Sequence, residues 1–447
     1  MTQHDLLRNL VVIPTTTRTD EENPQRQPGI VPPLASGVPR DVPLRYVGTA
    51  LASLGVAVGM LIAWGPELVS PGGFLLPHAL GVTHVMALGF ATSLAWGVLY
   101  IFAPSSFHQD VPMPRLCRGI WWAYTISVVA FVLSFVTDHV EYAAVAGPFL
   151  AAAVLGFVGQ IAVMAWRGRR RSAVTAMTSM AVAALALTAV LGSVLALNLS
   201  TGFLGNSDAI LGAKIILAIG GWIGLLIMGV SYHVVPMTNA SHARGRSALR
   251  IVVLLPAALA GGAIAVALQL PLAVRVAVMV PAVAASSLYA ADVVRFVRAR
   301  HHPLLTPMAV GQVAGASLIV VDSLLALAAV SGISPWPQLA VTTALLGWVP
   351  VLILSNGLRM IPVVMWSART PGERPQGAPA SPARLGWCVV VCALTGWALW
   401  QAAIVTTDGL LARGAAAILG LTFLALLGIA AVTGRRLRRS HRAPGVA

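Results

Sequence analysis

His84 is the residue of this sequence best placed to do chemistry, because it lies inside the long apolar stretch 77–104. A neutral imidazole is a good ligand for heme iron or copper. An ionisable residue about 9 Å below a membrane surface is a candidate for function by default. The alternative is a packing role, in which the ring hydrogen-bonds a carbonyl group of a neighbouring helix. We therefore predict His84 as a heme or copper ligand and keep the packing role as the competing interpretation.

Three neighbours of His84 belong to the same candidate site. His78 precedes His84 by six residues, which places it about 240° around a helix and at the membrane interface, where a solvated histidine is the simpler interpretation. Met86 could serve as a second axial ligand, although its spacing gives no support. Gly89 belongs to the motif Thr83–Ala91, which also contains His84.

Charged residues inside other apolar stretches form a second group of candidates. A lone carboxylate such as Asp322 costs at least ~2.5 kcal/mol in a bilayer, so we expect it to be protonated or paired, with Lys214 as the opposite charge. Its role is a proton relay or ligand-orienting group, or else a buried hydrogen bond. His233 and Arg359 lie one turn from a helix end, where snorkelling to the interface explains them.

A short pattern occurs three times in the chain and organises these candidates. A glycine followed by an aromatic residue precedes a proline by fifteen residues, with a small residue eight positions after the glycine. The three copies are Gly89-Phe90 with Gly97 and Pro104, Gly221-Trp222 with Gly229 and Pro236, and Gly347-Trp348 with Ser355 and Pro362. Internal repeats of this kind indicate copies of one structural unit.

The composition predicts an all-α polytopic membrane protein. The 447 residues are 57% hydrophobic and 10% charged, whereas a soluble domain is about a quarter charged. The net charge of +15 does not indicate a nucleic-acid partner, because most arginines flank apolar segments in the way that sets membrane topology. The partner that this composition requires is a lipid bilayer.

Twelve apolar segments are each near the ~20 residues that cross a bilayer. They are 44–65, 78–103, 119–137, 143–165, 174–198, 209–235, 248–268, 272–294, 306–330, 339–365, 385–405 and 412–433. Arginines occupy alternate loops, which predicts a bacterial-type cytoplasmic membrane protein with both termini in the cytoplasm. Residues 1–43 are expected to be a disordered cytoplasmic tail and 434–447 a basic one. The repeats fall on the second, sixth and tenth segments, which predicts three pseudo-symmetric four-helix units within 44–433.

Twelve helices, a period of four and a histidine near the outer end of the second helix together resemble subunit I of the heme–copper oxidases. The run Thr83-His84-Val85-Met86-Ala87-Leu88-Gly89-Phe90-Ala91 is also similar to a stretch of NnrS-type proteins, which contain heme and copper and are linked to nitric oxide. The resemblance covers about residues 44–433 and implies that His84 is an axial heme ligand.

The sequence also departs from subunit I. That family has histidine ligands on its tenth, sixth and seventh helices, whereas this chain has no histidine in 339–365 or 248–268, and His233 lies near the wrong end of the sixth. A complete oxygen-reducing centre is therefore not expected. We predict a heme protein, with copper as the less favoured metal, in electron transfer or nitric-oxide or metal handling with a redox partner protein. The competing class is a cofactor-free transporter or assembly factor.

Overall fold

The fold was analysed in a computed structural model, which describes residues 38–39, 41–168, 172–301, 304–369 and 381–440. Twelve helical spans in this part of the chain are long and apolar enough to cross a membrane, as the sequence predicts. Large apolar side chains on their outer faces, among them Phe149, Leu187 and Leu424, are more than half exposed and so face lipid. The protein is an integral membrane protein of the all-α class.

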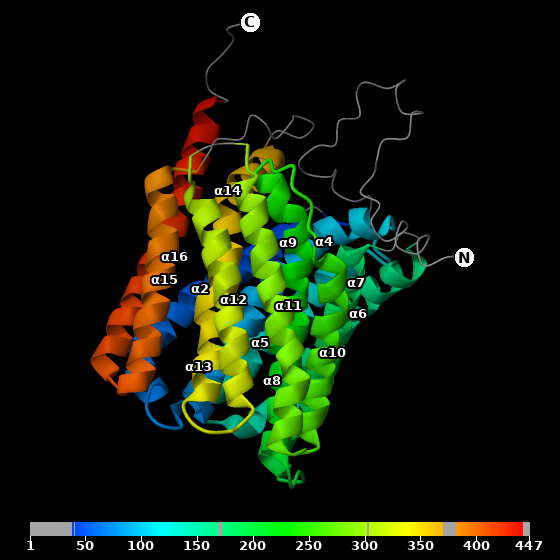
Figure 1. The fold of residues 1–447 in the computed structure, drawn as a ribbon, viewed down its shortest axis with the longest axis vertical. Coiled ribbons are helices and arrows are strands. Elements are labelled where there is room, and N and C mark those ends of the chain that lie inside the picture. The colour runs from blue at the N-terminus through cyan, green and yellow to red at the C-terminus, as the bar shows by residue number, and fades with distance from the viewer. Residues whose placement is uncertain (1–37, 40, 169–171, 302–303, 370–380, 441–447) are drawn as a thin grey trace, which may run out of the picture.

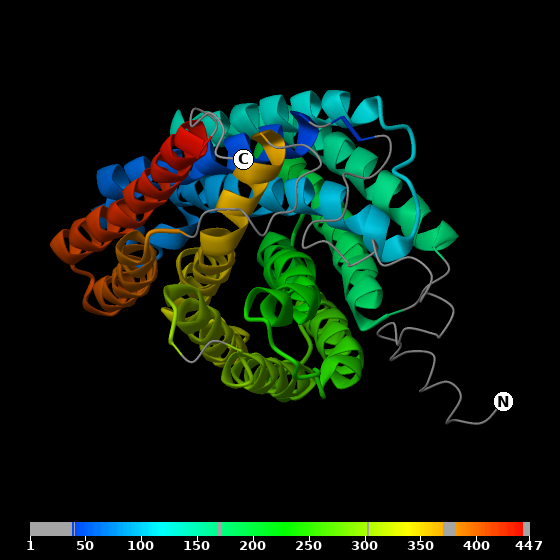
Figure 2. The ribbon, with the colours of Figure 1, turned by 90° about the horizontal axis from the view of Figure 1, so that it is seen from above.

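The spans run in sequence around the bundle (Figures 1 and 2). Eight are single helices, one is a helix preceded by a short 3-10 turn, and three consist of two α-helices joined by a π-helical segment. The first to twelfth spans are built from α2 (Asp41–Leu68); α3 (Pro77–His84), η2 (Val85–Thr92) and α4 (Ser93–Phe107); α5 (Leu116–Val136); η3 (Val140–Tyr142) and α6 (Ala143–Arg167); α7 (Ala173–Thr201); α8 (Ser207–Ile215), η4 (Ile216–Gly224) and α9 (Leu225–Thr238); α10 (Ala248–Ala267); α11 (Leu272–Arg298); α12 (Pro307–Ala329); α13 (Trp336–Thr342), η5 (Thr343–Trp348) and α14 (Val349–Arg369); α15 (Ala383–Thr406); and α16 (Gly409–Ser440).

Both predicted tail boundaries shift. Helix α2 begins at Asp41, three residues earlier than predicted. Helix α16 continues to Ser440, so residues 434–440 are helical and do not form a tail. Arginine and leucine are good helix formers, which lets the RRLRR segment extend the helix beyond its apolar part. The remaining predicted tail residues, 1–37 and 441–447, lie outside the described part of the chain.

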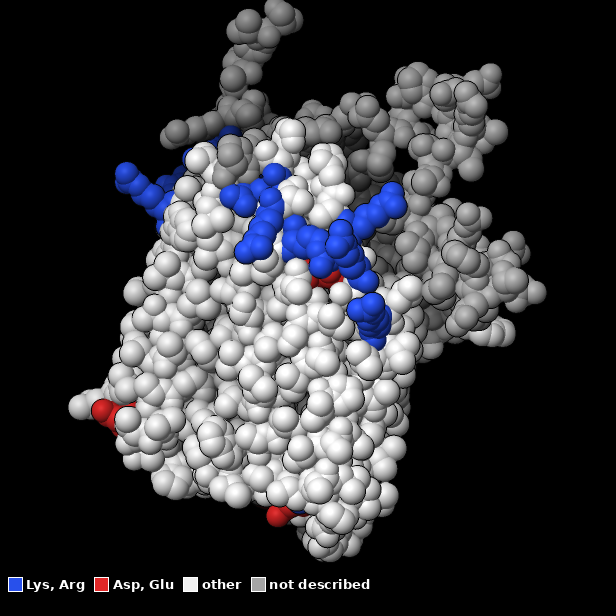
Figure 3. Space-filling model, in the orientation of Figure 1, with Lys and Arg blue, Asp and Glu red and all other residues white. Residues whose placement is uncertain are grey.

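Lysine and arginine side chains gather at one end of the bundle, and the wide band below them is almost free of charge (Figure 3). Arg167 ends α6, and Arg295 and Arg298 lie in the last turn of α11. This distribution fits a bilayer around the uncharged band, with the arginine-rich end in the interfacial region.

Each of the three repeated motifs contains a π-helical segment. The segments are η2, η4 and η5, and they contain Gly89-Phe90, Gly221-Trp222 and Gly347-Trp348 respectively. Such segments are rare and frequently occur at functional sites. They lie within the second, sixth and tenth spans, the three that the sequence pattern singles out.

Burial differs among these three spans. The most apolar window of the tenth span is 83% buried and that of the second is 61% buried, whereas the sixth reaches only 39%, like several outer spans. The second and tenth spans are therefore the interior of the bundle. The sixth contacts the second through a hydrogen bond of 2.9 Å from Trp222 Nε1 to Thr92 Oγ1.

Candidate functional site

His84 is the last residue of α3 and is held by its own helix. Its Nδ1 lies 2.6 Å from the carbonyl oxygen of Leu80, one turn earlier. A carbonyl oxygen can only accept a hydrogen bond, so Nδ1 carries the proton in the neutral ring. The lone pair is then on Nε2, for which no hydrogen bond is found among the described residues. A ring whose Nδ1 is fixed by a carbonyl group and whose Nε2 is free is typical of histidines that bind metals.

Two aromatic side chains of helix α5 contact the His84 ring, and they also contact each other at a centroid distance of 5.1 Å. Phe135 is nearly parallel to the ring, with a centroid distance of 5.5 Å and an interplanar angle of 7°. Phe131 meets it edge-on at 5.0 Å. The ring therefore lies between the second and third spans.

Lys214 is the nearest cation that acts on His84 electrostatically. Its Cε lies 3.5 Å from the position of a β-carbon at Gly192 on α7. No ion pair of the described residues includes Lys214.

His78 forms a separate group at the start of the second span. Its Nδ1 lies 3.0 Å from both carboxylate oxygens of Glu67, and its ring stacks on Trp64 at 4.4 Å with an interplanar angle of 8°. The side chain is 20% exposed. The solvated histidine predicted here is thus a half-buried member of a Trp64–Glu67–His78 cluster.

Met86 and Gly89 do not join His84. Met86 is buried and lines cavities on the side of the second span that faces the tenth. A β-carbon at Gly89 would lie 2.7 Å from Ser53 Cβ, so the glycine allows close contact between η2 and α2. The structure therefore gives Gly89 a packing role and places Met86 against a different set of neighbours from His84.

Asp322 is buried, but it does not pair with Lys214. Its Oδ2 accepts a hydrogen bond of 2.8 Å from Trp348 Nε1, across the contact between α12 and η5. No ion pair joins Asp322 to a cation in the described part of the chain. The adjacent Ser323 bonds Ser286 of α11 at 2.7 Å. This is the buried hydrogen bond that the sequence offered as the alternative to a relay.

His233 and Arg359 lie apart from these groups. His233 is exposed, and its ring meets Phe102 edge-on at 6.1 Å. Arg359 is half-buried on α14. Their places near the arginine-rich end agree with snorkelling side chains.

A polar cluster near the arginine-rich end was missed by sequence reasoning. Gln312 of α12 accepts a hydrogen bond of 2.7 Å from Asn239 and donates one of 2.8 Å to Asn356 and one of 3.1 Å to Thr238. These bonds join the sixth, ninth and tenth spans. The sequence feature that could have revealed this cluster is the presence of three amide side chains near the ends of apolar segments.

A second missed group is centred on the fully buried Asp292 of α11. It accepts hydrogen bonds from Tyr232 at 2.7 Å and from the backbone of Ser247 at 2.9 Å, and it pairs with Arg295. These contacts satisfy the hydrogen-bonding capacity of the buried carboxylate at the end of the eighth span. We therefore interpret this group as a structural one.

Among the described residues, His84 offers a metal one imidazole ligand whose Nε2 has no hydrogen-bond partner. One fixed imidazole with a free Nε2 can supply one axial position of a heme. Copper needs several donors, whereas no group of three or more His, Cys, Asp or Glu side chains lies together among the described residues. A porphyrin at Nε2 also needs space, and Phe131 and Phe135 are the side chains that must move to provide it.

Comparison with known proteins adds no assignment: no family model matches the chain, and no curated protein matches it.

Proposed function

We propose that this protein is a membrane protein of the subunit I type, built from three four-helix units, which binds one heme through His84. The observation that supports the three units is the position eight residues after each repeated glycine. A β-carbon at Gly97 would lie 3.2 Å from Tyr46 Cβ, and one at Gly229 would lie 3.0 Å from Met177 Cβ. In the third copy, Ser355 Cβ lies 2.9 Å from the β-carbon position of Gly311.

These three contacts are made with α2, α7 and α12, which are the first, fifth and ninth spans. Equivalent positions thus contact helices that are themselves four apart, which is what a repeated four-helix unit requires. The repeated glycine itself also contacts equivalent helices, four apart in the chain, in two of the three copies. Gly89 and Gly221 pack against α2 and α7, whereas Gly347 packs against Trp397 of α15.

The support for a heme at His84 is the free Nε2 of a ring whose Nδ1 is fixed by Leu80. When bound, the heme supplies one-electron or gas-binding chemistry at its iron. The chain contributes the axial nitrogen, the aromatic side chains Phe131 and Phe135, and an environment in which apolar side chains exclude water. With no second histidine beside it, the site suits electron transfer or nitric-oxide handling with a redox partner protein, and no oxygen-reducing centre is proposed.

The location that we propose is the cytoplasmic membrane, with both termini in the cytoplasm. The arginine-rich end of the bundle supports this orientation. His84 then lies in the half of the membrane near the opposite surface, because it follows the start of the second span by seven residues.

A visible difference spectrum of the purified protein tests the heme. We expect a reduced-minus-oxidised spectrum with a Soret band that is lost in His84→Gly and partly restored by added imidazole. His78→Ala is the matched control, because His78 has its own partners in Glu67 and Trp64, and it should keep the band. A band that persists in His84→Gly without imidazole would show that the ligand is another residue.

The second candidate is a cofactor-free transporter or assembly factor on the same scaffold. It is favoured by the contacts of the His84 ring with Phe131 and Phe135. In this case the protein is colourless, and His84→Leu keeps the stability of the folded bundle. The same purification therefore separates the two candidates.

A further inference from the structure

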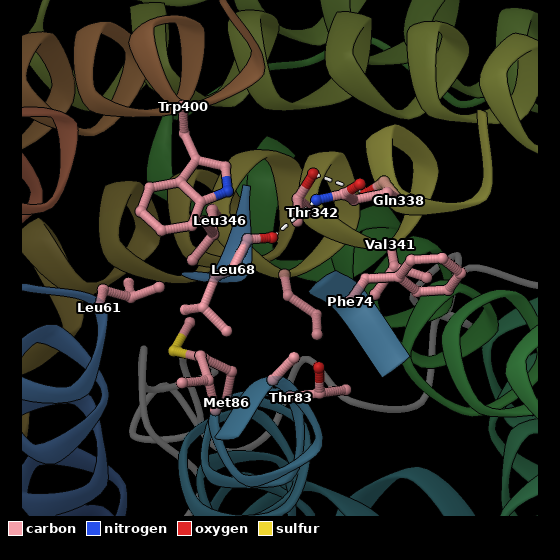
Figure 4. Close-up of a pocket in the computed structure, with 13 residues that line it drawn as sticks. Leu61, Leu68, Phe74, Thr83, Met86, Gln338, Val341, Thr342, Leu346 and Trp400 are labelled. Atoms are coloured by element: carbon pink, nitrogen blue, oxygen red, sulfur yellow. Dashed lines mark hydrogen bonds between the residues drawn. The ribbon is translucent and has the colours of Figure 1, made fainter. Parts of the chain in front are cut away.

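Two cavities lie between the second and tenth spans, and Figure 4 shows the first of them. The first has a volume of about 50 Å³ and the second about 30 Å³. They share the lining residues Leu61, Met86 and Leu346, and we call the two neighbouring cavities together the inner cavity. It lies on the opposite side of the second span from the His84 ring and its contacts with α5.

The inner cavity contains two buried polar atoms without a partner. The indole of Trp400 reaches from α15 into the first part (Figure 4), and the hydroxyl of Thr422 on α16 lines the second. Trp400 is 2% exposed and Thr422 is 4% exposed, yet neither Trp400 Nε1 nor Thr422 Oγ1 has a hydrogen-bond partner in the described part of the chain. A buried donor that has lost its water and gained no partner costs free energy.

Two other buried indoles are paired within the protein, whereas that of Trp96 has no hydrogen-bond partner in the part of the chain that the structure describes. Trp222 donates to Thr92, and Trp348 donates to Asp322. Trp400 differs from Trp96 in that its side chain lines a cavity. A molecule that occupies the space and accepts a hydrogen bond would remove the cost.

The lining limits what that molecule can be. None of the side chains that line either part is charged, which excludes an ion. An apolar cavity of about 150 Å³ holds benzene, so a smaller space of this kind suits about two to four non-hydrogen atoms. Leu68, Phe74 and Gln338 place one end of the cavity near the membrane surface opposite the arginine-rich end.

We propose that the inner cavity is a binding site for a small neutral molecule that accepts a hydrogen bond from Trp400 Nε1. Thr422 offers a second hydroxyl donor deeper in the cavity. The remaining contacts are apolar, so the ligand presents one acceptor atom and an otherwise apolar surface. This site is independent of the heme proposed at His84.

Two probes of the same shape test the site in the full-length protein in detergent. Acetonitrile has an acceptor nitrogen, and propyne has none. The reporter is the methyl NMR resonance of Met86, which lines both parts of the cavity and can be assigned with Met86→Leu. We expect acetonitrile to shift this resonance saturably and to bind about fivefold more tightly than propyne, because only acetonitrile gains the hydrogen bond.

Variants identify the donor. Trp400→Phe should remove the advantage of acetonitrile and leave the binding of propyne unchanged. Trp96→Phe is the matched control, because Trp96 also has a buried Nε1 without a partner but lines neither part of the cavity. If Trp400→Phe does not fold, the comparison of the two probes on the unmodified protein still shows whether a hydrogen bond contributes to binding. Failure of either probe to shift Met86, or equal affinity for both, would overturn the proposal.

Discussion

Trp348 Nε1 donates a hydrogen bond of 2.8 Å to Asp322 Oδ2, and both residues are buried. Trp348 belongs to the repeated motif of the tenth span, and Asp322 is the carboxylate in the middle of the ninth. The bond therefore joins the tenth span, which is the most buried, directly to the ninth, without a bridging water. A carboxylate at this depth is retained because the indole N–H satisfies one of its oxygens.

Asp322→Ala should destabilise the protein by about 1–3 kcal/mol, because it leaves the buried Trp348 N–H without an acceptor. Asp322→Asn keeps an acceptor oxygen and should cost less. Thermal unfolding in detergent measures both, and Trp348→Phe combined with Asp322→Ala should cost less than the sum of the two single changes. Equal losses for the Asn and Ala variants would mean that the negative charge, and not the hydrogen bond, is required.

Gly89→Ala should destabilise the contact between η2 and α2. The added β-carbon would lie 2.7 Å from Ser53 Cβ, which is closer than real β-carbon contacts. Overpacking of this kind costs about 1–3 kcal/mol. Ser53→Gly should restore stability in the double variant, whereas Gly59→Ala on α2, which has nothing within 4 Å, should be harmless. Unfolding midpoints of the four proteins check this packing.

Gln312→Leu should lower stability more than any surface amide change. It removes the acceptor of Asn239 and the donor to Asn356 in a buried cluster that joins three spans. The expected loss is about 2–4 kcal/mol, from two unsatisfied buried groups. Gln269→Leu removes an exposed bond to Asn206 and is the matched control, with a loss below about 0.5 kcal/mol. Similar losses in the two variants would contradict the structural role of the cluster.

Single cysteines should report the proposed orientation. In a protein without Cys117, Cys388 and Cys392, Ser241→Cys lies in a loop at the arginine-rich end and Gly205→Cys in a loop at the opposite end. A membrane-impermeant maleimide should label Gly205→Cys from outside intact cells and Ser241→Cys only in inverted vesicles. The reverse labelling would place the termini outside the cytoplasm.

The number and order of the spans could be predicted because each is a long apolar segment bounded by polar residues and arginines. The exact ends could not, since the basic residues after 433 continue α16 as readily as they could form a tail. The repeated Gly and aromatic pattern pointed to the spans that contain η2, η4 and η5. Their π-helical form was not predictable, because it depends on contacts with other helices.

The candidate site was only partly predictable. The sequence places His84 near the start of the second span, where the structure has it at the end of α3, but the direction of its ring depends on Phe131 and Phe135, which come from another span. Lys214 was expected at Asp322 because it has the opposite charge, whereas the neighbour that reaches the carboxylate is Trp348. The Gln312 cluster was missed because isolated amides in apolar segments give no pattern until the helices are assembled.

The heme content of the purified protein tests the central proposal most directly. A pyridine hemochrome assay on protein produced with an adequate heme supply should give about one heme per chain, falling to background in His84→Ala and unchanged in His78→Ala. A folded protein with no heme, or with the same heme content in His84→Ala, would contradict the account.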